Sequence, residues 1–330
     1  MRGPSVSTAT DMGKPRMLGR TAQNLFWLSR YIERAENMAR LLEVGYRMSL
    51  TSRREGGASE HLVSMMLAAE VDEEFNKKYK LADVATVSHF MLFDEDNLSS
   101  VRACLTAART NARSVRTALT SDVWETINSA YLEFSQLTPR DITGGRLTEL
   151  LQWVKQVSHQ YRGALLSTIL RDDGYAFSQI GNFVERADNT ARILDMKYYV
   201  LLPRVTLVGG DVDIQQWTLI LRAASAHRSY RHVYHDRFKA WNIADYLILN
   251  GRMPRSLTFC YRFLAEHLHF REQDYGLRLP CHQTVEDTLA TLRVGSIKQI
   301  FDAGLHEFLT DFIQDNYRLG DEVAKDYRFH

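Results

Sequence analysis

Two stretches of the chain carry apolar residues at intervals of three and four, which is the spacing of one face of a long helix. In the first stretch these residues are Leu25, Leu28, Ile32, Ala35, Ala39, Leu42 and Tyr46. In the second stretch they are Ile180, Val184, Ala187, Ala191, Leu194 and Tyr198. No long run alternates with the period of a strand, although Val205–Val208 could form a short extended piece. We therefore predict an all-α protein with about a dozen helices arranged in bundles.

The two stretches also resemble each other residue by residue. Residues 28–46 align without a gap on residues 180–198 at an offset of 152, with 8 identities and 6 conservative exchanges in 19 positions. A weaker match relates Ser100–Cys104 to Ser256–Cys260. Internal similarity of this kind indicates duplication, so we predict two helical halves, 17–140 and 141–330, packed as one unit. Residues 1–16 are polar without an apolar signal-peptide core, so we expect a disordered extension there, with Met1 or Met17 as the start.

Composition narrows the class of protein without naming a function. Hydrophobic residues make up 45% of the chain and charged residues 25%, as in globular proteins. The net charge of +1 argues against a dedicated nucleic-acid-binding protein, and no segment approaches the about 18 apolar residues that span a membrane. Cys104, Cys260 and Cys281 lack metal-binding spacing. We expect a cytoplasmic protein without disulfides, bound metal or another cofactor, since nucleotide-binding and metalloprotease motifs are also missing.

The repeated helix carries a second pattern, made of polar residues that recur in both copies. Glu33, Asn37 and Arg40 lie within about 60° of one another on a helical wheel, opposite the apolar stripe, and Arg34 flanks them. The second copy keeps the same residue types, at Glu185, Arg186, Asn189 and Arg192. Three interpretations stay open: a solvated face with i,i+4 ion pairs, a buried polar network between the halves, or a ligand site. The mid-helix asparagine favours one of the last two, because asparagine has a poor helix propensity.

A further polar cluster contains Arg109, Asn111 and Arg113. Arg109, Arg113 and Arg116 share one helical face, where like charges repel each other unless an anion meets them. We expect Glu33 and Glu185 from neighbouring helices to be that partner, with a bound carboxylate or phosphate as the alternative.

Arg255 and Ser256 follow Pro254 at the start of another predicted helix. Ser256 is expected to cap this helix, which is the favoured interpretation, and Arg255 could instead help to hold an anion at its N-terminus. His232 and His235 share a helix face, but the Glu-x-x-His pattern of a di-metal bundle is missing, so no metal site is predicted.

Several of these motifs together resemble the alpha-E family, bacterial helical proteins named for a Glu-Arg motif. The matching segments, in the family's order, are residues 17–40, 97–102, 108–113, 124–128, 184–192 and 253–257. The resemblance covers about residues 17–320 and places the motif at Glu33, Arg34, Glu185 and Arg186. It implies a gene context: such proteins are encoded beside, or fused to, a circularly permuted ATP-grasp protein, with transglutaminase-like proteins nearby. It implies no catalytic role for the alpha-E member itself.

Three functions are therefore set against one another. The favoured one is an accessory or interaction protein of an ATP-grasp peptide (amide) ligase system. The first alternative is an enzyme that acts on a small carboxylate, amide or phosphorylated substrate through a cleft lined by the glutamates and arginines. The second alternative is a purely structural scaffold with a buried ion network. Solvent access to the motif separates them, because an open cleft favours the enzyme and complete internal pairing excludes that site for substrate.

Overall fold

The computed structural model describes residues 17–51, 57–142, 145–199, 210–235 and 238–329, and within these ranges it contains helices and no strand. The predicted all-α class is therefore confirmed, while Val205–Val208 lies outside the described residues. Two short 3₁₀ helices, η1 (Arg116–Ala118) and η2 (Pro139–Ile142), accompany the α-helices. In chain order the α-helices are α1 (Gly19–Thr51), α2 (Gly57–Ala68), α3 (Asp72–Lys78), α4 (Val84–Leu92), α5 (Val101–Ser114), α6 (Ser121–Ser135), α7 (Arg146–Thr168), α8 (Asp173–Tyr199), α9 (Asp211–Ala223), α10 (His227–Tyr234), α11 (Ala240–Ile248), α12 (Leu257–Tyr275), α13 (Pro280–Val294), α14 (Ile297–Ala303) and α15 (Leu305–Asp326).

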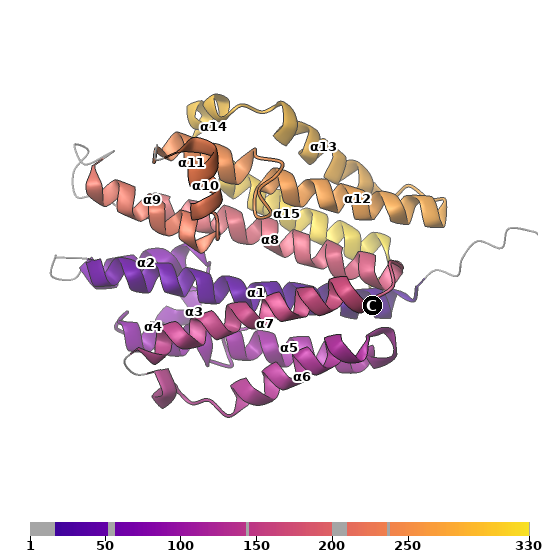
Figure 1. Ribbon diagram of the computed structural model, residues 1–330, viewed down its shortest axis with the longest axis horizontal. Coiled ribbons are helices and arrows are strands. Elements are labelled where there is room, and N and C mark those ends of the chain that lie inside the picture. The colour runs from indigo at the N-terminus through magenta and orange to yellow at the C-terminus, as the bar shows by residue number, and fades with distance from the viewer. Residues whose placement is uncertain (1–16, 52–56, 143–144, 200–209, 236–237, 330) are drawn as a thin grey trace, which may run out of the picture.

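Helices α1 and α8, which carry the two copies of the repeated sequence, lie side by side through the middle of the molecule (Figure 1). They run in the same direction, because Phe26 meets Gly181 and, further along both helices, Glu33 meets Arg186. The two backbones approach closely at the first of these points. A Cβ atom at Gly181 would collide with the carbonyl oxygen of Phe26, so only glycine permits this contact.

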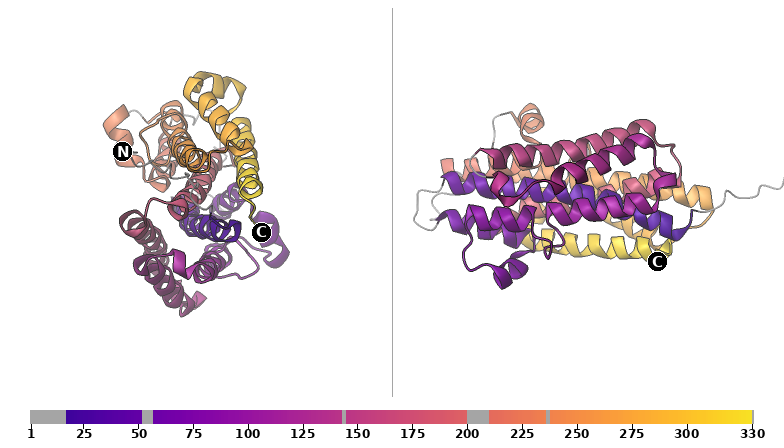
Figure 2. Two further views of the ribbon diagram at one scale, coloured as in Figure 1. Left: turned by 90° about the vertical axis from the view of Figure 1, so that its right-hand side faces the viewer. Right: turned by 90° about the horizontal axis from the view of Figure 1, so that it is seen from below.

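The remaining helices enclose this central pair. Helices α5 and α7 pack on α1 and are joined by α6, whereas α12 and α15 pack on α8 and are joined by α13. Helices α2 and α9 each contact both central helices. The two groups of helices lie on opposite sides of the central pair (Figures 1 and 2). One continuous apolar core runs through both groups. Since α1 and α8 are covered on several sides, their polar faces are buried together with their apolar stripes.

The packing gives a different division of the chain from the predicted one at residue 140. Helix α7 belongs with α1 and α6 by its contacts, so the first group of helices ends at Thr168 and the second begins at Asp173. Pro139 begins the short helix η2, and α7 begins only at Arg146. The order of helices after this new boundary parallels the order before it. That parallel supports the duplication, which stays a prediction.

Helices α5 and α12, which occupy corresponding positions in the two groups, begin in the same way. The Ser100 hydroxyl accepts a hydrogen bond from the backbone N–H of Ala103 at the start of α5. The Ser256 hydroxyl accepts one from Phe259 at the start of α12, at 3.0 Å. Both serines are therefore N-caps, and the predicted capping role of Ser256 is found.

Two further findings bear on the class of protein. Within the described part of the chain, no helix combines the length and the apolar character needed to cross a bilayer. Cys104, Cys260 and Cys281 are all buried as free thiols. Burial raises the pKa of the Cys104 thiol to about 12, so this side chain is a packing residue rather than a nucleophile.

Candidate functional site

The repeated Glu-Arg pairs of α1 and α8 meet each other at the centre of the molecule. The Arg186 guanidinium binds the Glu33 carboxylate at 2.9 Å. The Arg34 guanidinium binds the Glu185 carboxylate at 2.6 Å. The glutamate of each copy is thus paired with the arginine of the other copy. This reciprocal pairing is the contact pattern that two-fold related surfaces produce.

Two arginines from other helices complete the environment of Glu33. Arg162 of α7 donates a hydrogen bond to Glu33 at 2.6 Å, and Arg255, just before α12, donates one at 2.9 Å. The same two arginines also bind Glu36, at 2.7 Å and 2.6 Å respectively. Glu36 is bound in addition by Arg40, one turn along its own helix. Four elements of the fold are therefore tied together through two carboxylates.

The environment of Glu185 is smaller. Besides Arg34, the Arg30 guanidinium binds this carboxylate at 2.8 Å. The Arg30 guanidinium also lies 4.6 Å from the ring centroid of Trp27, which is a cation–π contact.

Arg40 and Arg192, which correspond in the two copies, each join a carboxylate of their own helix to the end of another helix. Arg40 donates hydrogen bonds to Glu36 and to the last carbonyl of α9, on Ala223. Arg192 donates to Asp188 at 2.7 Å and to the last carbonyl of α2, on Ala68, at 3.3 Å. A cation at a helix C-terminus satisfies free carbonyl groups and complements the helix dipole. These two arginines therefore stabilise helix ends as well as ion pairs.

Burial and charge act in opposite directions on the motif carboxylates. Burial alone would raise the pKa of Glu33, but Arg186, Arg255 and Arg162 outweigh it and lower that pKa to about 2. For Glu185, burial is likewise outweighed by Arg34 and Arg30, and the pKa falls to about 2.

Burial and neighbouring arginines also act in opposite directions on the pKa values of Glu36 and Asp188. The pKa of Glu36 lies well below its ordinary value, because Arg255, Arg40 and Arg162 outweigh burial. At Asp188 burial prevails over Arg192 and raises the pKa. Glu33, Glu36 and Glu185 are thus anions at neutral pH with lone pairs already bound, which makes them poor general bases.

The network is closed to solvent over most of its extent. Glu33 and Glu185 are 1% and 2% exposed, and Arg186, Arg192 and Arg255 are buried as well. Among the described arginines that bind Glu33, Glu36 and Glu185, Arg34 and Arg162 have the most exposed side chains, at 21% and 18%. Of the three interpretations of the repeated polar face, the structure therefore has the buried network.

Asn37 and Asn189 occupy corresponding positions but differ in their hydrogen bonds. Asn189 donates to the backbone carbonyl of Glu33 at 3.3 Å. Neither polar atom of the buried Asn37 amide has a hydrogen-bond partner among the described residues. A buried amide without partners costs free energy, so the two asparagines contribute differently to stability.

Replacing each asparagine by alanine is expected to reveal this difference. Asn37→Ala should change the free energy of unfolding by less than about 1 kcal/mol, because alanine favours the helix and no hydrogen bond is lost. Asn189→Ala should lower that free energy by about 1 kcal/mol more than Asn37→Ala does, since it removes a bond between the central helices. Urea denaturation of both variants measures the difference, and a larger loss for Asn37→Ala would contradict the assignment.

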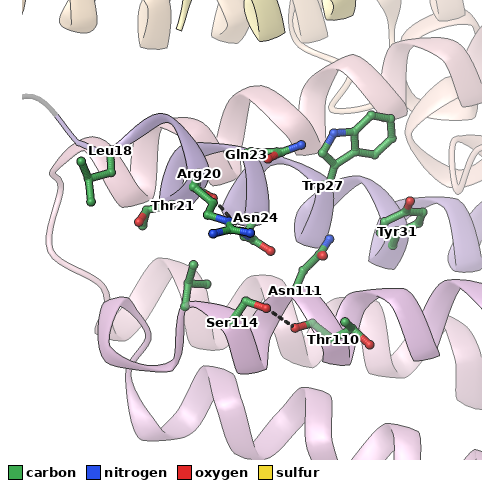
Figure 3. A pocket seen from close by; sticks show the side chains of 11 residues that line it. Leu18, Arg20, Thr21, Gln23, Asn24, Trp27, Tyr31, Thr110, Asn111 and Ser114 are labelled. Carbon is green, nitrogen blue, oxygen red and sulfur yellow. Dashed lines mark hydrogen bonds between the residues drawn. The ribbon is translucent and has the colours of Figure 1, made fainter. Parts of the chain in front are cut away.

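The predicted polar cluster of α5, made of Arg109, Asn111 and Arg113, lies outside the network. Arg109 donates a hydrogen bond to Asn128 at 2.9 Å and its guanidinium lies over the Tyr131 ring. Arg113 is exposed. Asn111 lines an open groove of about 760 Å³ between α1 and α5 (Figure 3). The expected pairing of this cluster with Glu33 and Glu185 is wrong, because other arginines bind those carboxylates.

Arg255 and Ser256 have separate roles. Ser256 caps α12, whereas the Arg255 side chain binds Glu33 and Glu36. Arg255 is therefore a member of the network and is not arranged to hold an external anion at the start of α12.

Sequence reasoning missed two arginines of the network, Arg30 and Arg162. Arg30 corresponds to Asn182 in the second copy, so comparison of the copies drew attention away from it. Arg162 lies one position after the buried Tyr161 and one turn after the buried Ser158. An arginine at the border of an apolar stripe was the available signal for its burial.

No group of three or more histidine, cysteine, aspartate or glutamate side chains within the described ranges is arranged to hold a metal ion. The arrangement at the centre of the molecule is thus an ion network of protein groups, with arginine in excess over carboxylate.

Sequence comparison relates the chain to known proteins. The model of the Alpha-E family, described as a predicted alpha-helical domain with a conserved ER motif, matches residues 17–327. Uncharacterized proteins of Mycobacterium bovis and of two Mycobacterium tuberculosis strains are each 24% identical over 268 residues. The matched region covers 75% of this chain and 29% of each relative, so the chain spans less than a third of their length. No solved structure shows a significant match.

Proposed function

The chain belongs to the Alpha-E family, and we propose that it is an interaction protein whose Glu-Arg motif stabilises its own centre. One observation carries this proposal: the motif carboxylates of Glu33 and Glu185 are buried, ionised and bound by arginines of the same chain. A carboxylate in that state has neither the access nor the basicity that proton transfer from a substrate needs. The motif therefore argues for a rigid helical body and against a Glu/Arg active-site cleft at this place.

The proposed partner is the circularly permuted ATP-grasp protein of an amide-ligase system, with a transglutaminase-like protein as a further component. The resemblance of the motifs to alpha-E proteins is the reason for naming these partners. The mycobacterial relatives add support, because in them the matched region is a minor part of a longer chain. In these relatives the Alpha-E region is joined to other sequence in one chain. In this protein the same region would instead work beside a separate partner protein. The cytoplasm is the compartment proposed for this system.

The duplication belongs to the same proposal. Reciprocal pairing of Glu33 with Arg186 and of Arg34 with Glu185 follows directly if two copies of one helical unit first associated and were later fused. In that case the Glu-Arg motif began as the interface between the copies and became the interior of the fused protein.

Co-purification tests the proposed partnership. The tagged protein, expressed with the ATP-grasp protein encoded beside it, should elute with that protein in size-exclusion chromatography. ATP turnover in the presence of amino acids should require both proteins, because the helical protein supplies a surface and the ATP-grasp protein supplies the chemistry. Absence of a complex at micromolar concentrations would contradict the proposal.

A variant of the motif separates the interaction protein from the enzyme. Glu185→Gln should leave turnover by the complex unchanged at temperatures where circular dichroism shows that the variant is folded. If the helical protein alone turned over substrate, and the folded Glu185→Gln variant lost that activity, the motif would be catalytic and the proposal would be wrong.

A further inference from the structure

The groove between α1 and α5 is a feature that neither the central network nor the function proposed above uses. Its volume of about 760 Å³ lies within the range of about 300–1,000 Å³ that small-ligand sites occupy. Figure 3 shows Asn111 pointing from α5 towards α1, with Trp27 and Tyr31 towards one end of the groove and Leu18 at the other. The groove thus follows α1 over about 20 Å, at a rise of about 1.5 Å per residue.

The corresponding place between α8 and α12 is filled by aromatic rings. At the offset that relates α1 to α8, Gln23 corresponds to Tyr175, and at the offset that relates the N-caps of α5 and α12, Asn111 corresponds to His267. The rings of Tyr175 and His267 lie with their centroids 5.5 Å apart, and His267 also stacks on Phe183 at 6.3 Å. His267 is 6% exposed, whereas Asn111 is only half-buried. Packing of the corresponding helices therefore does not require an open groove, and the amides of the first copy need another explanation.

The amides in the groove are available for a ligand. Gln23 on α1 and Asn111 on α5 both line the groove, and neither side chain forms a hydrogen bond with the residues that the structure describes. Each of these amides carries a carbonyl acceptor and an N–H donor. A peptide group offers the complementary N–H and C=O. Two such amides, one from each wall, therefore suit a ligand made of successive peptide groups.

Arg20 marks the end of the groove at the start of α1. This exposed residue lies in the first turn of α1, which contains no acidic residue and where the helix dipole disfavours a cation. Its guanidinium lines the groove and forms no ion pair with any residue in the described ranges. A carboxylate bound there would pair with Arg20 and would complement the N-terminal end of the helix dipole. The position is thus suited to the anionic end of a ligand.

Trp27 and Tyr31 give the other end of the groove an apolar wall. Their ring centroids lie 5.6 Å apart with the ring planes inclined by 32°, and both residues are half-buried. Aromatic rings of this kind present a large, rigid apolar surface to a ligand. Along α1 the groove therefore offers a cation, then amides, then aromatic rings.

We propose that this groove binds a short, extended peptide with a free C-terminal carboxylate. The carboxylate lies at Arg20, the peptide groups are bound by Gln23 and Asn111, and an apolar side chain of the peptide packs on Trp27 and Tyr31. An extended chain rises about 3.3 Å per residue, so about four or five residues reach from the cation to the rings. The proposal goes beyond the function proposed above, because the groove takes this ligand whether or not an ATP-grasp partner binds.

Affinity selection from a peptide pool tests the site. The full-length protein is equilibrated with acetylated tetrapeptides built from glycine, alanine, serine, leucine and tyrosine, and mass spectrometry identifies those that elute with it in size-exclusion chromatography. Isothermal calorimetry then measures the affinity of the most enriched peptide, with a free carboxylate and with a C-terminal amide. The free carboxylate should bind about threefold more tightly or better, as a partly exposed ion pair provides.

The central variant combines Gln23→Tyr with Asn111→His, which gives the groove the two rings that close the corresponding place at Tyr175 and His267. It should weaken peptide binding by about tenfold or more, because the rings occupy the groove and the free amides are lost. Its melting temperature should stay the same or rise, since the added rings bury apolar surface.

Arg20→Gln is the second variant and should bring the affinities for the free and the amidated peptide within about twofold of each other. Its matched control is Arg113→Gln, an equal charge change at an exposed position of α5 outside the groove, which should keep the preference for the free carboxylate.

Three results would overturn the proposal: no tetrapeptide elutes with the protein, the folded double variant binds as well as the unmodified protein, or Arg20→Gln keeps the preference for the free carboxylate. The last result decides even if the double variant does not fold. Tighter binding of maltotriose than of the most enriched peptide would also overturn it, because the amides and rings would then form a carbohydrate site.

Discussion

Replacing Glu33 by glutamine is expected to lower the free energy of unfolding by about 3–5 kcal/mol. Glu33 is the shared partner of Arg186, Arg162 and Arg255, and all three charges stay in place when the carboxylate is removed. Leaving a buried charge without its counter-ion costs far more than losing an exposed pair, because water cannot replace the missing partner. Urea denaturation followed by circular dichroism measures the change in free energy.

An exposed pair on the same molecule provides the control for Glu33→Gln. Arg318 and Asp315 lie 2.8 Å apart on α15, with side chains 63% and 45% exposed. Asp315→Asn should change the free energy of unfolding by less than about 1 kcal/mol, as exposed ion pairs usually do. If Glu33→Gln cost no more than this control, the network would not be a source of stability, and the structural role given to the motif would fail.

The helices at the centre could be predicted from sequence because their apolar positions are periodic over many turns. Leu25 to Tyr46 and Ile180 to Tyr198 both keep the helical interval, and both became long helices, α1 and α8. The apolar periodicity does not predict which groups contact the opposite, polar face of these helices. A helical wheel looks the same whether Glu33 faces water or faces the arginine of a second helix. The repetition of Glu, Arg, Asn and Arg at one offset, together with an asparagine in mid-helix, was the local sign that this face was not simply solvated.

The arginine cluster on α5 shows where pattern reasoning went too far. Three like charges on one helix face were expected to need the carboxylates of Glu33 or Glu185. In the structure each of these arginines has its own environment. Arg109 lies over the Tyr131 ring, Arg116 lies over the Trp124 ring, and Arg113 is exposed to solvent. Aromatic rings and water thus do what an anion was expected to do. These contacts exist because α6 packs beside α5. The sequence of α5 alone does not show which helix will pack against it.

Lowering the pH from about 5 towards 3 is expected to destabilise the protein steeply. The pKa values of Glu33 and Glu185 are about 2 in the folded protein against an ordinary 4.5. A carboxyl with a depressed folded pKa contributes stability that is present above its unfolded pKa and is lost as the pH falls towards the folded value. Each of the two contributes about 3 kcal/mol by this argument. Asp188 acts with the opposite sign, because its raised pKa favours the folded state at low pH, and it offsets part of the loss.

Urea denaturation at a series of pH values between 3 and 7 measures this dependence, and two variants identify its source. The free energy of unfolding depends on pH through each carboxyl that gains its proton only on unfolding. Below the unfolded pKa, each such carboxyl lowers this free energy by about 1.4 kcal/mol for every pH unit that the pH falls. Glu185→Gln removes one such group and should flatten the curve by that amount, although the variant is less stable at every pH. Asp315→Asn, on the exposed surface, should follow the unmodified protein throughout. If the Glu185→Gln curve ran parallel to that of the unmodified protein, protonation elsewhere would drive acid unfolding. Glu185 would then not be held as a buried anion by Arg30 and Arg34.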